Sequence, residues 1–165
     1  MKLENLRIRS DQPQAWERPT EIHDSARKIE LKLAGLDGAF LPLSEAAHRE
    51  GLFDYTVCVA EADGTVVGFA AYSEEELAWL YVDPARMRGG IGRALAQYAL
   101  QQIGASPMSV EVLAGNEPAL RLYESLGFGA IEICSGVMPG NEAFPVTVYR
   151  MRRLPAVTQT QSLEI

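Results

Sequence analysis

The chain has 165 residues, 47% hydrophobic and 22% charged, with 15 Lys and Arg against 22 Asp and Glu, a net charge of −7. This length suits one domain with its own core, and the acidic balance disfavours nucleic acid and anionic membranes as partners. No apolar run reaches the ~20 residues of a membrane-spanning helix, and the first residues do not resemble a signal peptide. We therefore expect a cytoplasmic protein with one domain at residues 1–154 and a flexible tail at 155–165.

The N-terminal part of the sequence predicts a short strand and two helices. The strand is expected at residues 6–9, and an amphipathic helix is expected to begin at Thr20 and end at Gly35. Its apolar residues recur every three or four positions and so share one helix face; they are Ile22, Ala26, Ile29 and Leu33. A shorter helix is expected from Ser44 to Gly51.

The remaining sequence predicts an antiparallel meander, two helices docked on a sheet, and a terminal hairpin. The first two strands flank Asp63-Gly64, a typical hairpin turn. The expected strands cover residues 55–60, 65–72, 77–82, 110–113, about 130–134 and about 144–151, and the helices cover 91–103 and 116–126. This order of elements predicts an α/β (α+β) fold with a mixed sheet.

A glycine-rich segment, Arg-Gly-Gly-Ile-Gly-Arg at residues 88–93, separates the strand at 77–82 from the following helix. Its glycines permit close approach of a ligand, and the amides of a helix N-terminus favour an anion. Residues 84–110 include three Arg and no Asp or Glu, so this segment carries +3 and the remainder −10. The segment therefore predicts a phosphate or pyrophosphate site.

Other readings of this glycine segment fit less well. A P-loop needs Lys followed by Ser or Thr after its glycines, and neither pair is present. A dinucleotide-binding turn needs a third small residue where Leu95 stands, and seven residues separate Val82 from Gly90, although Glu111 fits the position of a ribose-binding acid. An ordinary glycine-rich loop is the remaining alternative.

A second motif covers residues 116–128 and places Asn116 and Tyr123 on one helix face. Its sequence is Asn-Glu-Pro-Ala-Leu-Arg-Leu-Tyr-Glu-Ser-Leu-Gly-Phe. With Val-Asp-Pro at residues 82–84 and Gly-Ile-Gly-Arg-Ala-Leu at 90–95, the chain resembles the GNAT superfamily of acetyl-CoA-dependent N-acetyltransferases. The likeness covers about residues 55–151. It departs at Met87, where the family usually carries Gln or Arg.

The resemblance implies a single-domain GNAT-like fold, with a mixed, mostly antiparallel sheet splayed at its centre and helices on both faces. Acetyl-CoA would lie in the opening between the strands at 77–82 and 110–113, with a backbone amide near Val82 as oxyanion donor. No metal is expected, because His23 and His48 lack neighbouring ligands. The implied cofactor-binding residues are Tyr81, Val82, Arg88, Gly89, Gly90, Ile91, Gly92, Arg93, Asn116 and Tyr123.

For catalysis, the resemblance implies direct attack of a primary amine on acetyl-CoA in a ternary complex, since neither cysteine has a paired base. Tyr123 would protonate the leaving thiolate, and Glu111, or as second choice Glu76, would serve as base. Helix capping by Asn116 and a solvated role for Glu111 remain alternatives. A non-catalytic acyl-CoA-binding or regulatory module is the alternative function.

The acceptor is expected to be a small-molecule or peptide amine, and a homodimer is possible. The acceptor pocket should involve the N-terminal helices at about residues 22–51 and the loop at 137–145. Acidic residues in these segments hint at a cationic amine; they are Glu21, Asp24, Glu30, Asp37, Glu45, Glu50 and Glu142.

Overall fold

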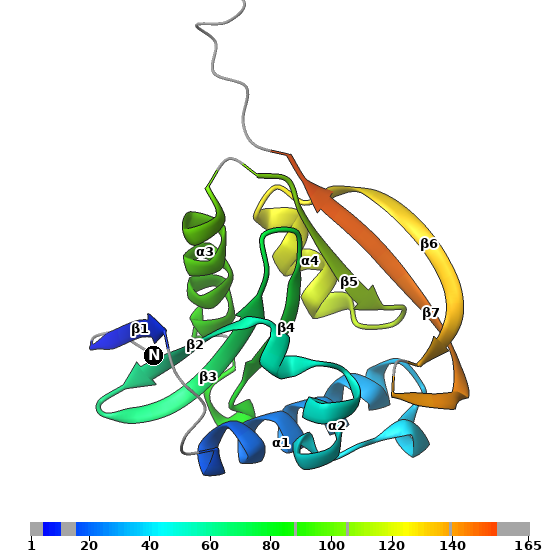
Figure 1. The fold of residues 1–165 in the computed structure, drawn as a ribbon, viewed down its shortest axis with the longest axis horizontal. Helices are drawn as coiled ribbons and strands as arrows, with labels where there is room; N and C mark the ends of the chain where they lie inside the picture. Colours follow the sequence, from blue (N-terminus) through cyan, green and yellow to red (C-terminus); the bar gives the residue numbers. More distant parts are fainter. Residues whose placement is uncertain (1–4, 11–15, 88, 105, 139, 155–165) are drawn as a thin grey trace, which may run out of the picture.

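The computed structural model describes residues 5–10, 16–87, 89–104, 106–138 and 140–154, and it forms two antiparallel sheets (Figure 1). The first sheet has the order β1-β2-β3-β4 and the second β5-β7-β6. The strands are β1 (Leu6–Ser10), β2 (Thr56–Ala62), β3 (Thr65–Tyr72), β4 (Leu77–Val82), β5 (Met108–Leu113), β6 (Gly129–Met138) and β7 (Asn141–Arg153).

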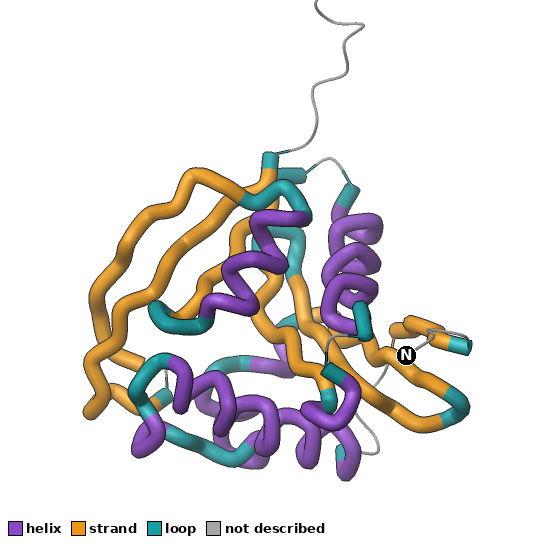
Figure 2. Tube along the Cα trace, turned by 180° about the vertical axis from the view of Figure 1, so that it is seen from behind, coloured by secondary structure: helices purple, strands orange, loops and turns teal. Residues whose placement is uncertain are grey.

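Helices cover both faces of the first sheet (Figure 2). They are α1 (Glu17–Leu33), α2 (Leu43–Arg49), α3 (Ile91–Ile103) and α4 (Glu117–Ser125), with short 3₁₀ turns at Asp37–Ala39, Leu52–Asp54 and Pro84–Arg86. None of the helices described is long and apolar enough to cross a membrane. Seen from behind, α3 and α4 lie on one side of the strands, and α1 and α2 run beneath them.

Strands β2 and β3 are buried on both faces over most of their length, which is why each is a nearly continuous apolar run. In β4, Leu77 and Trp79 are buried, Ala78 is exposed, and Leu80 to Val82 are partly buried. Phe69 and Trp79 belong to the core under α1 and α2, whereas Ala70 and Leu95 belong to the core under α3 and α4. A third core joins the end of α1 to the second sheet; it contains Leu31, Ala39, Leu113 and Met138.

Most expected elements are present, and β4 and α3 have the expected bounds. The C-terminal strands are longer than expected, because β6 and β7 continue as a hairpin as far as Met138 and Asn141. The last strand, β7, lies between β5 and β6, so the terminal hairpin completes the second sheet rather than extending the first.

The first helix differs from the expectation at its start and along its face. It begins at Glu17 with Trp16 as N-cap, and not at Thr20. Ile22 and Ala26 are buried as expected, but Ile29 and Leu33 are exposed, at 41% and 48%. The end of α1 packs instead through Leu31 against the second sheet, because the two sheets diverge and present a different surface to each half of the helix.

The two sheets meet at one point and then separate. Ser109 at the start of β5 forms a parallel bridge with Glu76, and its amide donates to the Glu75 carbonyl oxygen at 2.8 Å. Among the described residues, no further strand pairing joins β4 to β5. The sheet is therefore splayed between β4 and β5, as the sequence predicted, and α1 passes under the gap.

Gly68 on β3 allows α3 to pack closely on the sheet. A Cβ atom there would lie 3.0 Å from the Tyr81 carbonyl oxygen and 3.0 Å from Leu95 Cδ1. We therefore expect Gly68→Ala to lower the free energy of unfolding by about 1–3 kcal/mol, as overpacking a tight core does. Urea unfolding measures this loss; Gly136→Ala, on β6 with open space around it, is the control. Equal midpoints for the two variants would contradict the prediction.

Candidate active site

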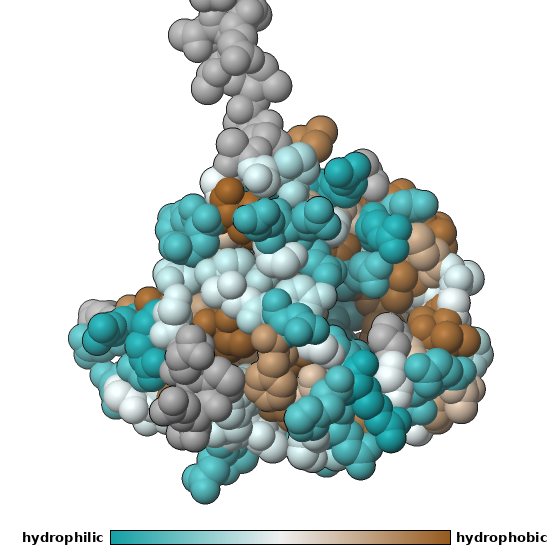
Figure 3. Space-filling model, viewed as in Figure 1, coloured by the Kyte–Doolittle hydropathy of each residue, from teal (hydrophilic) through white to brown (hydrophobic). Residues whose placement is uncertain are grey.

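A pocket of about 260 Å³ lies in the opening between the two sheets. Side chains from α1, β4, β5 and α4 line it, together with the residue that follows α2. Its polar lining residues include Arg27, Glu30, Glu50, Tyr55, Glu111 and Tyr123. Figure 3 shows this face hollowed to the right of its centre, with hydrophilic side chains on the left of the hollow and hydrophobic ones on its right.

Tyr123 reaches the pocket from α4. Its ring packs edge-on against Phe128, with 5.5 Å between ring centroids, and the residue is only 7% exposed. Its hydroxyl has no hydrogen-bond partner within the part of the chain that the structure describes. Burial, and then the charge of Glu30, raise the pKa of this phenol, so it stays protonated at neutral pH. Tyr123 is therefore a buried proton donor that faces a cavity.

Glu30 on α1 is the centre of a polar network at one wall of the pocket. Its carboxylate pairs with Arg27 and accepts hydrogen bonds from Tyr81 Oη at 3.5 Å and Asn116 Nδ2 at 3.2 Å. Asn116 also caps α4, because its Oδ1 accepts from the Ala119 amide at 3.4 Å. Helix capping by Asn116 is thus confirmed, while its contact with a cofactor stays a prediction.

The two carboxylates considered as bases are both engaged. Glu111 lines the pocket but is 48% exposed at its side chain, and its Oε1 accepts from Arg150 Nη2 at 2.9 Å. Glu76 accepts a hydrogen bond from the hydroxyl of Tyr55. Burial, and then this bond, raise the pKa of Tyr55 to about 12, so Tyr55 keeps its proton and Glu76 remains the acceptor.

The glycine segment leads directly into α3. Gly90 is the N-cap residue in a left-handed conformation, with φ of 82°, which favours glycine. No side chain caps this helix and no acidic residue lies in its first turn, which leaves its amides available to an anion. Of the other residues predicted here, Ile91 is buried in the core and Arg88 lies outside the described residues.

Gly92 and Arg93 lie in the first turn of α3, and the contact of their backbone amides with a pyrophosphate stays a prediction. A Cβ atom at Gly92 would meet Val82 and Leu122 at 3.6 Å, an ordinary contact distance, so this position does not require glycine for packing. The Arg93 side chain donates from Nη2 to Ser125 Oγ at 2.5 Å. It therefore ties α3 to α4.

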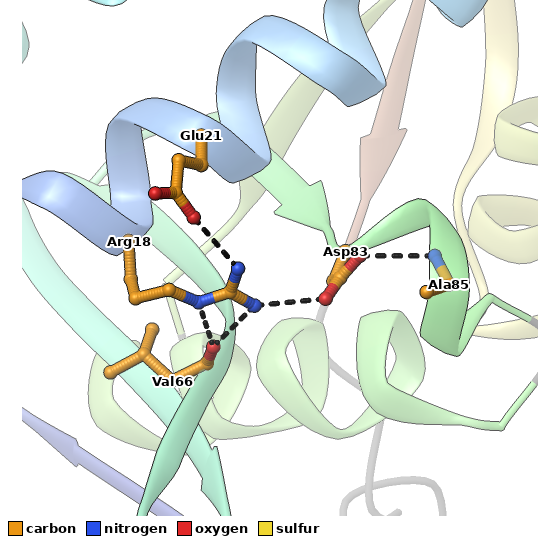
Figure 4. A network of polar contacts seen from close by, with 5 residues as sticks. All are labelled: Arg18, Glu21, Val66, Asp83 and Ala85. Carbon is orange, nitrogen blue, oxygen red and sulfur yellow. Dashed lines mark hydrogen bonds and ion pairs between the residues drawn. The ribbon is translucent and has the colours of Figure 1, made fainter.

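Arg18 on α1 holds the turn that leads from β4 to the glycine segment (Figure 4). Its Nη2 lies 2.8 Å from Asp83 Oδ2, and its Nε donates to the Val66 carbonyl oxygen at 3.1 Å. Asp83 Oδ1 accepts from the Ala85 amide. Burial would raise the pKa of Asp83, but the Ala85 amide and the Arg18 guanidinium outweigh burial and hold that pKa below its usual value.

Because the folded state lowers the pKa of Asp83, this contact stabilises the protein above the carboxyl's ordinary pKa, and the gain disappears as pH falls through the lowered value. We expect Asp83→Asn to cost about 1 kcal/mol at pH 7 and less at pH 3, which is below the ordinary pKa of the carboxyl group. Urea unfolding at both pH values measures this. Glu21→Gln is the control, because the Glu21 side chain is 64% exposed in its pair with Arg18. A loss of equal size at both pH values would refute the assignment.

Comparison with known proteins identifies this architecture. Residues 53–129 match the family described as acetyltransferase (GNAT) domain. The peptidyl-lysine N-acetyltransferase YiaC of Escherichia coli K12 is 37% identical over 75 residues, which are 45% of this chain and 50% of the relative. The ribosomal protein bS18-alanine N-acetyltransferase of the same strain is 34% identical over 84 residues, 47% of this chain and 57% of the relative. Over residues 53–129, the chain is therefore similar to the GNAT family of acetyltransferases.

Solved GNAT structures share the whole fold. The crystal structure of the S18-alanine N-acetyltransferase from Escherichia coli aligns with a TM-score of 0.69 at 23% identity, covering 93% of this chain and 96% of the other. The PaiA N-acetyltransferase from Thermoplasma acidophilum, solved in complex with coenzyme A, aligns with a TM-score of 0.62 at 19% identity, covering 90% and 98%. By sequence, however, the chain spans only about half the length of the curated relatives that it matches.

The GNAT fold brings together residues that lie far apart in the sequence. Tyr81, Glu111, Asn116 and Tyr123 all lie at or beside the pocket, and Val82 ends the strand that forms its wall. Arg27 and Tyr55 were missed, because an arginine and a tyrosine outside a motif carry no signal of a site. His23, left open as a surface or substrate-side residue, is buried against Trp79 and Tyr81, and burial lowers its pKa.

Proposed function

We propose that this protein transfers an acetyl group from acetyl-CoA to a primary amine by direct attack in a ternary complex. The single observation that carries this proposal is the unpartnered, protonated hydroxyl of Tyr123 in a pocket between two diverging strands. A phenol in that position can donate a proton to the leaving thiolate as the C–S bond breaks. The phenol then regains a proton from the attacking nitrogen.

The acetyl-CoA side of the site is proposed to run from the pocket to the start of α3. The edge of β4 that faces β5 has backbone groups at Tyr81 and Val82 free of strand pairing within the described structure. Such groups can bind an extended amide chain as an added strand would. The pyrophosphate would lie at the amides that follow Gly90.

The acceptor side is proposed to bind a cationic amine. Three carboxylates line the pocket, Glu30, Glu50 and Glu111, against the single lining cation Arg27. Relatives of this chain acetylate a peptidyl lysine and the alanine of a ribosomal protein. We therefore infer that the acceptor is an amine of a peptide or protein.

The decisive experiment measures thiol release from acetyl-CoA with two peptide probes, one beginning with alanine and one with an internal lysine and a blocked N-terminus. Release that depends on either probe, with an acetylated product seen by mass spectrometry, supports the proposal. Stoichiometric binding of acetyl-CoA without turnover on these probes and a broad amine panel would instead favour an acyl-CoA-binding module. The homodimer, the cytoplasmic location and the domain boundary at residue 154 stay predictions from the sequence.

A further inference from the structure

Glu50 has an unusual place among the acidic residues of the pocket. It directly follows α2, its side chain is partly buried, and it lines the same cavity as Tyr123. Within the described structure, its carboxylate forms no hydrogen bond and no ion pair. A partly buried carboxylate without a partner is costly unless a ligand satisfies it. Glu50 therefore provides an open acceptor for a proton or an ammonium group.

The other carboxylates near the pocket are already satisfied. Glu111 is bound by Arg150 at 2.9 Å, and Glu76 accepts from Tyr55. Glu30 pairs with Arg27 and accepts two further hydrogen bonds. A carboxylate held by a guanidinium is a weak base, because the cation stabilises its charged form. Glu50 is the one carboxylate of the described pocket lining without such a partner.

Burial and the neighbouring charges make the Glu50 carboxylate more basic than an ordinary glutamate. Burial, and then the nearby Glu30, raise the pKa of Glu50, while Arg27 acts in the opposite direction. Tyr81, on the adjoining strand β4, stays neutral because burial raises its own pKa. The neighbouring Arg49 does not neutralise Glu50, since its guanidinium donates to the Gly140 carbonyl oxygen at 2.9 Å. A base with a raised pKa works more effectively near neutral pH.

The hydroxyl of Tyr123 is a second, independent sign that a ligand belongs in this pocket. The residue is more than nine-tenths buried, it faces the cavity, and no described group bonds its hydroxyl. The pocket thus holds an unpartnered hydroxyl, from α4, and an unpartnered carboxylate, from the end of α2. An acyl transfer to an ammonium needs one of each: a base for the nitrogen and an acid for the sulfur.

We propose that the Glu50 carboxylate binds the acceptor's ammonium group and removes its proton, an assignment that rests on the acetyltransferase function proposed above. The N–H bond breaks, its proton moves to Glu50 Oε, and the freed electron pair attacks the acetyl carbonyl carbon. The C–N bond forms and the C–S bond breaks, with its electron pair on sulfur. Sulfur takes a proton from Tyr123, the second nitrogen proton restores Tyr123, and Glu50 passes its proton to water.

The test compares Glu50→Gln with the wild type, using acetyl-CoA and the peptide that begins with alanine. Without the base, only the neutral amine reacts, and an α-amine with a pKa of about 7.7–8.0 is roughly 5% neutral at pH 6.5. We therefore expect kcat/KM for the peptide to fall about twentyfold at pH 6.5. The loss should shrink above pH 8, and KM for acetyl-CoA should not change.

The pH profile separates a catalytic role from a structural one. In the wild type, kcat/KM should fall at acid pH as the Glu50 carboxylate becomes protonated. In Glu50→Gln, this fall should instead occur at a higher pH, near the pKa of the peptide's α-amine. Glu50→Asp keeps a carboxylate and should retain most of the wild-type limb. Glu45→Gln, on the outer side of α2 with a half-exposed side chain, is the matched control and should behave as wild type.

The outcomes separate the two proposals. If the wild type acetylates the peptide and Glu50→Gln, with an unchanged melting temperature, keeps its rate and profile, Glu50 is not the base and the function stands. Loss of the acid limb in Glu111→Gln would then assign the base to Glu111. If the wild type acetylates no amine, the proposed function fails and the role of Glu50 fails with it.

Discussion

Gly90→Glu is expected to weaken acetyl-CoA binding at least a hundredfold. The substitution places a carboxylate at the N-cap of α3, where the first-turn amides would hold a pyrophosphate and no acidic residue now lies. The introduced carboxylate would repel the negatively charged pyrophosphate, and its side chain adds bulk where a phosphate must approach closely. Calorimetric titration with acetyl-CoA measures the loss directly and does not depend on the acceptor.

Two further variants separate charge from backbone strain in this experiment. Gly90→Ala keeps the left-handed backbone, with φ of 82°, and adds about 1–2 kcal/mol of strain without a charge. It should bind acetyl-CoA far better than Gly90→Glu does. Gly64→Glu adds the same charge in open space at the β2–β3 turn and should bind as the wild type does. Wild-type affinity in Gly90→Glu would place the pyrophosphate elsewhere.

Tyr123→Phe is expected to lower kcat on the order of a hundredfold, while the affinity for acetyl-CoA changes little. The ring contact with Phe128 is kept, so the substitution removes the hydroxyl alone. General acid catalysis contributes about 10²–10⁴-fold, and the buried phenol lines the pocket without a hydrogen-bond partner among the described residues. Steady-state thiol release with the better of the two peptide probes measures kcat.

The matched control for Tyr123→Phe is Tyr98→Phe. Tyr98 is a partly buried tyrosine of α3 whose hydroxyl lies 3.5 Å from Ser10 Oγ, away from the pocket lining. The Tyr98→Phe substitution should leave kcat unchanged. Loss of activity in both variants would indicate a general effect on the fold. Full activity in Tyr123→Phe would remove this residue from the mechanism, and an unchanged melting temperature would show that the result concerns chemistry.

The positions of most elements could be predicted from the sequence, because their causes are local. The strand at residues 77–82 is an apolar run that ends before Asp-Pro. The helix at 91–103 begins directly after Gly90, its N-cap residue in a left-handed conformation. The start of α1 was misplaced because Thr20 is a good cap residue, yet the chain enters the helix earlier, at Trp16. The exposed Ile29 could not be foreseen, because the divergence of two distant sheets decides which face of α1 is buried.

The candidate site was only partly predictable. Two short motifs pointed to Gly90 and Tyr123. The glycine segment before a helix favours an anion by its chemistry, and Tyr123 lies in a motif that resembles the GNAT family. The state of each carboxylate was not predictable. Glu111 meets Arg150 only because β7 inserts beside β5, and Glu30 meets Asn116 across 86 residues of sequence.

Sequence alone determined the likeness to the GNAT family, the order of the elements and the cationic segment in an acidic chain, because each depends on residues close together in the sequence. Only the tertiary structure decided which acidic groups are free. Seven acidic residues of the N-terminal helices and the late loop were equivalent in sequence, and folding turned two of them, Glu30 and Glu50, into the pocket. A residue that neutralises a carboxylate can come from any element of the fold. Whether a carboxylate is free to bind a ligand therefore depends on tertiary packing and cannot be read from a local sequence motif.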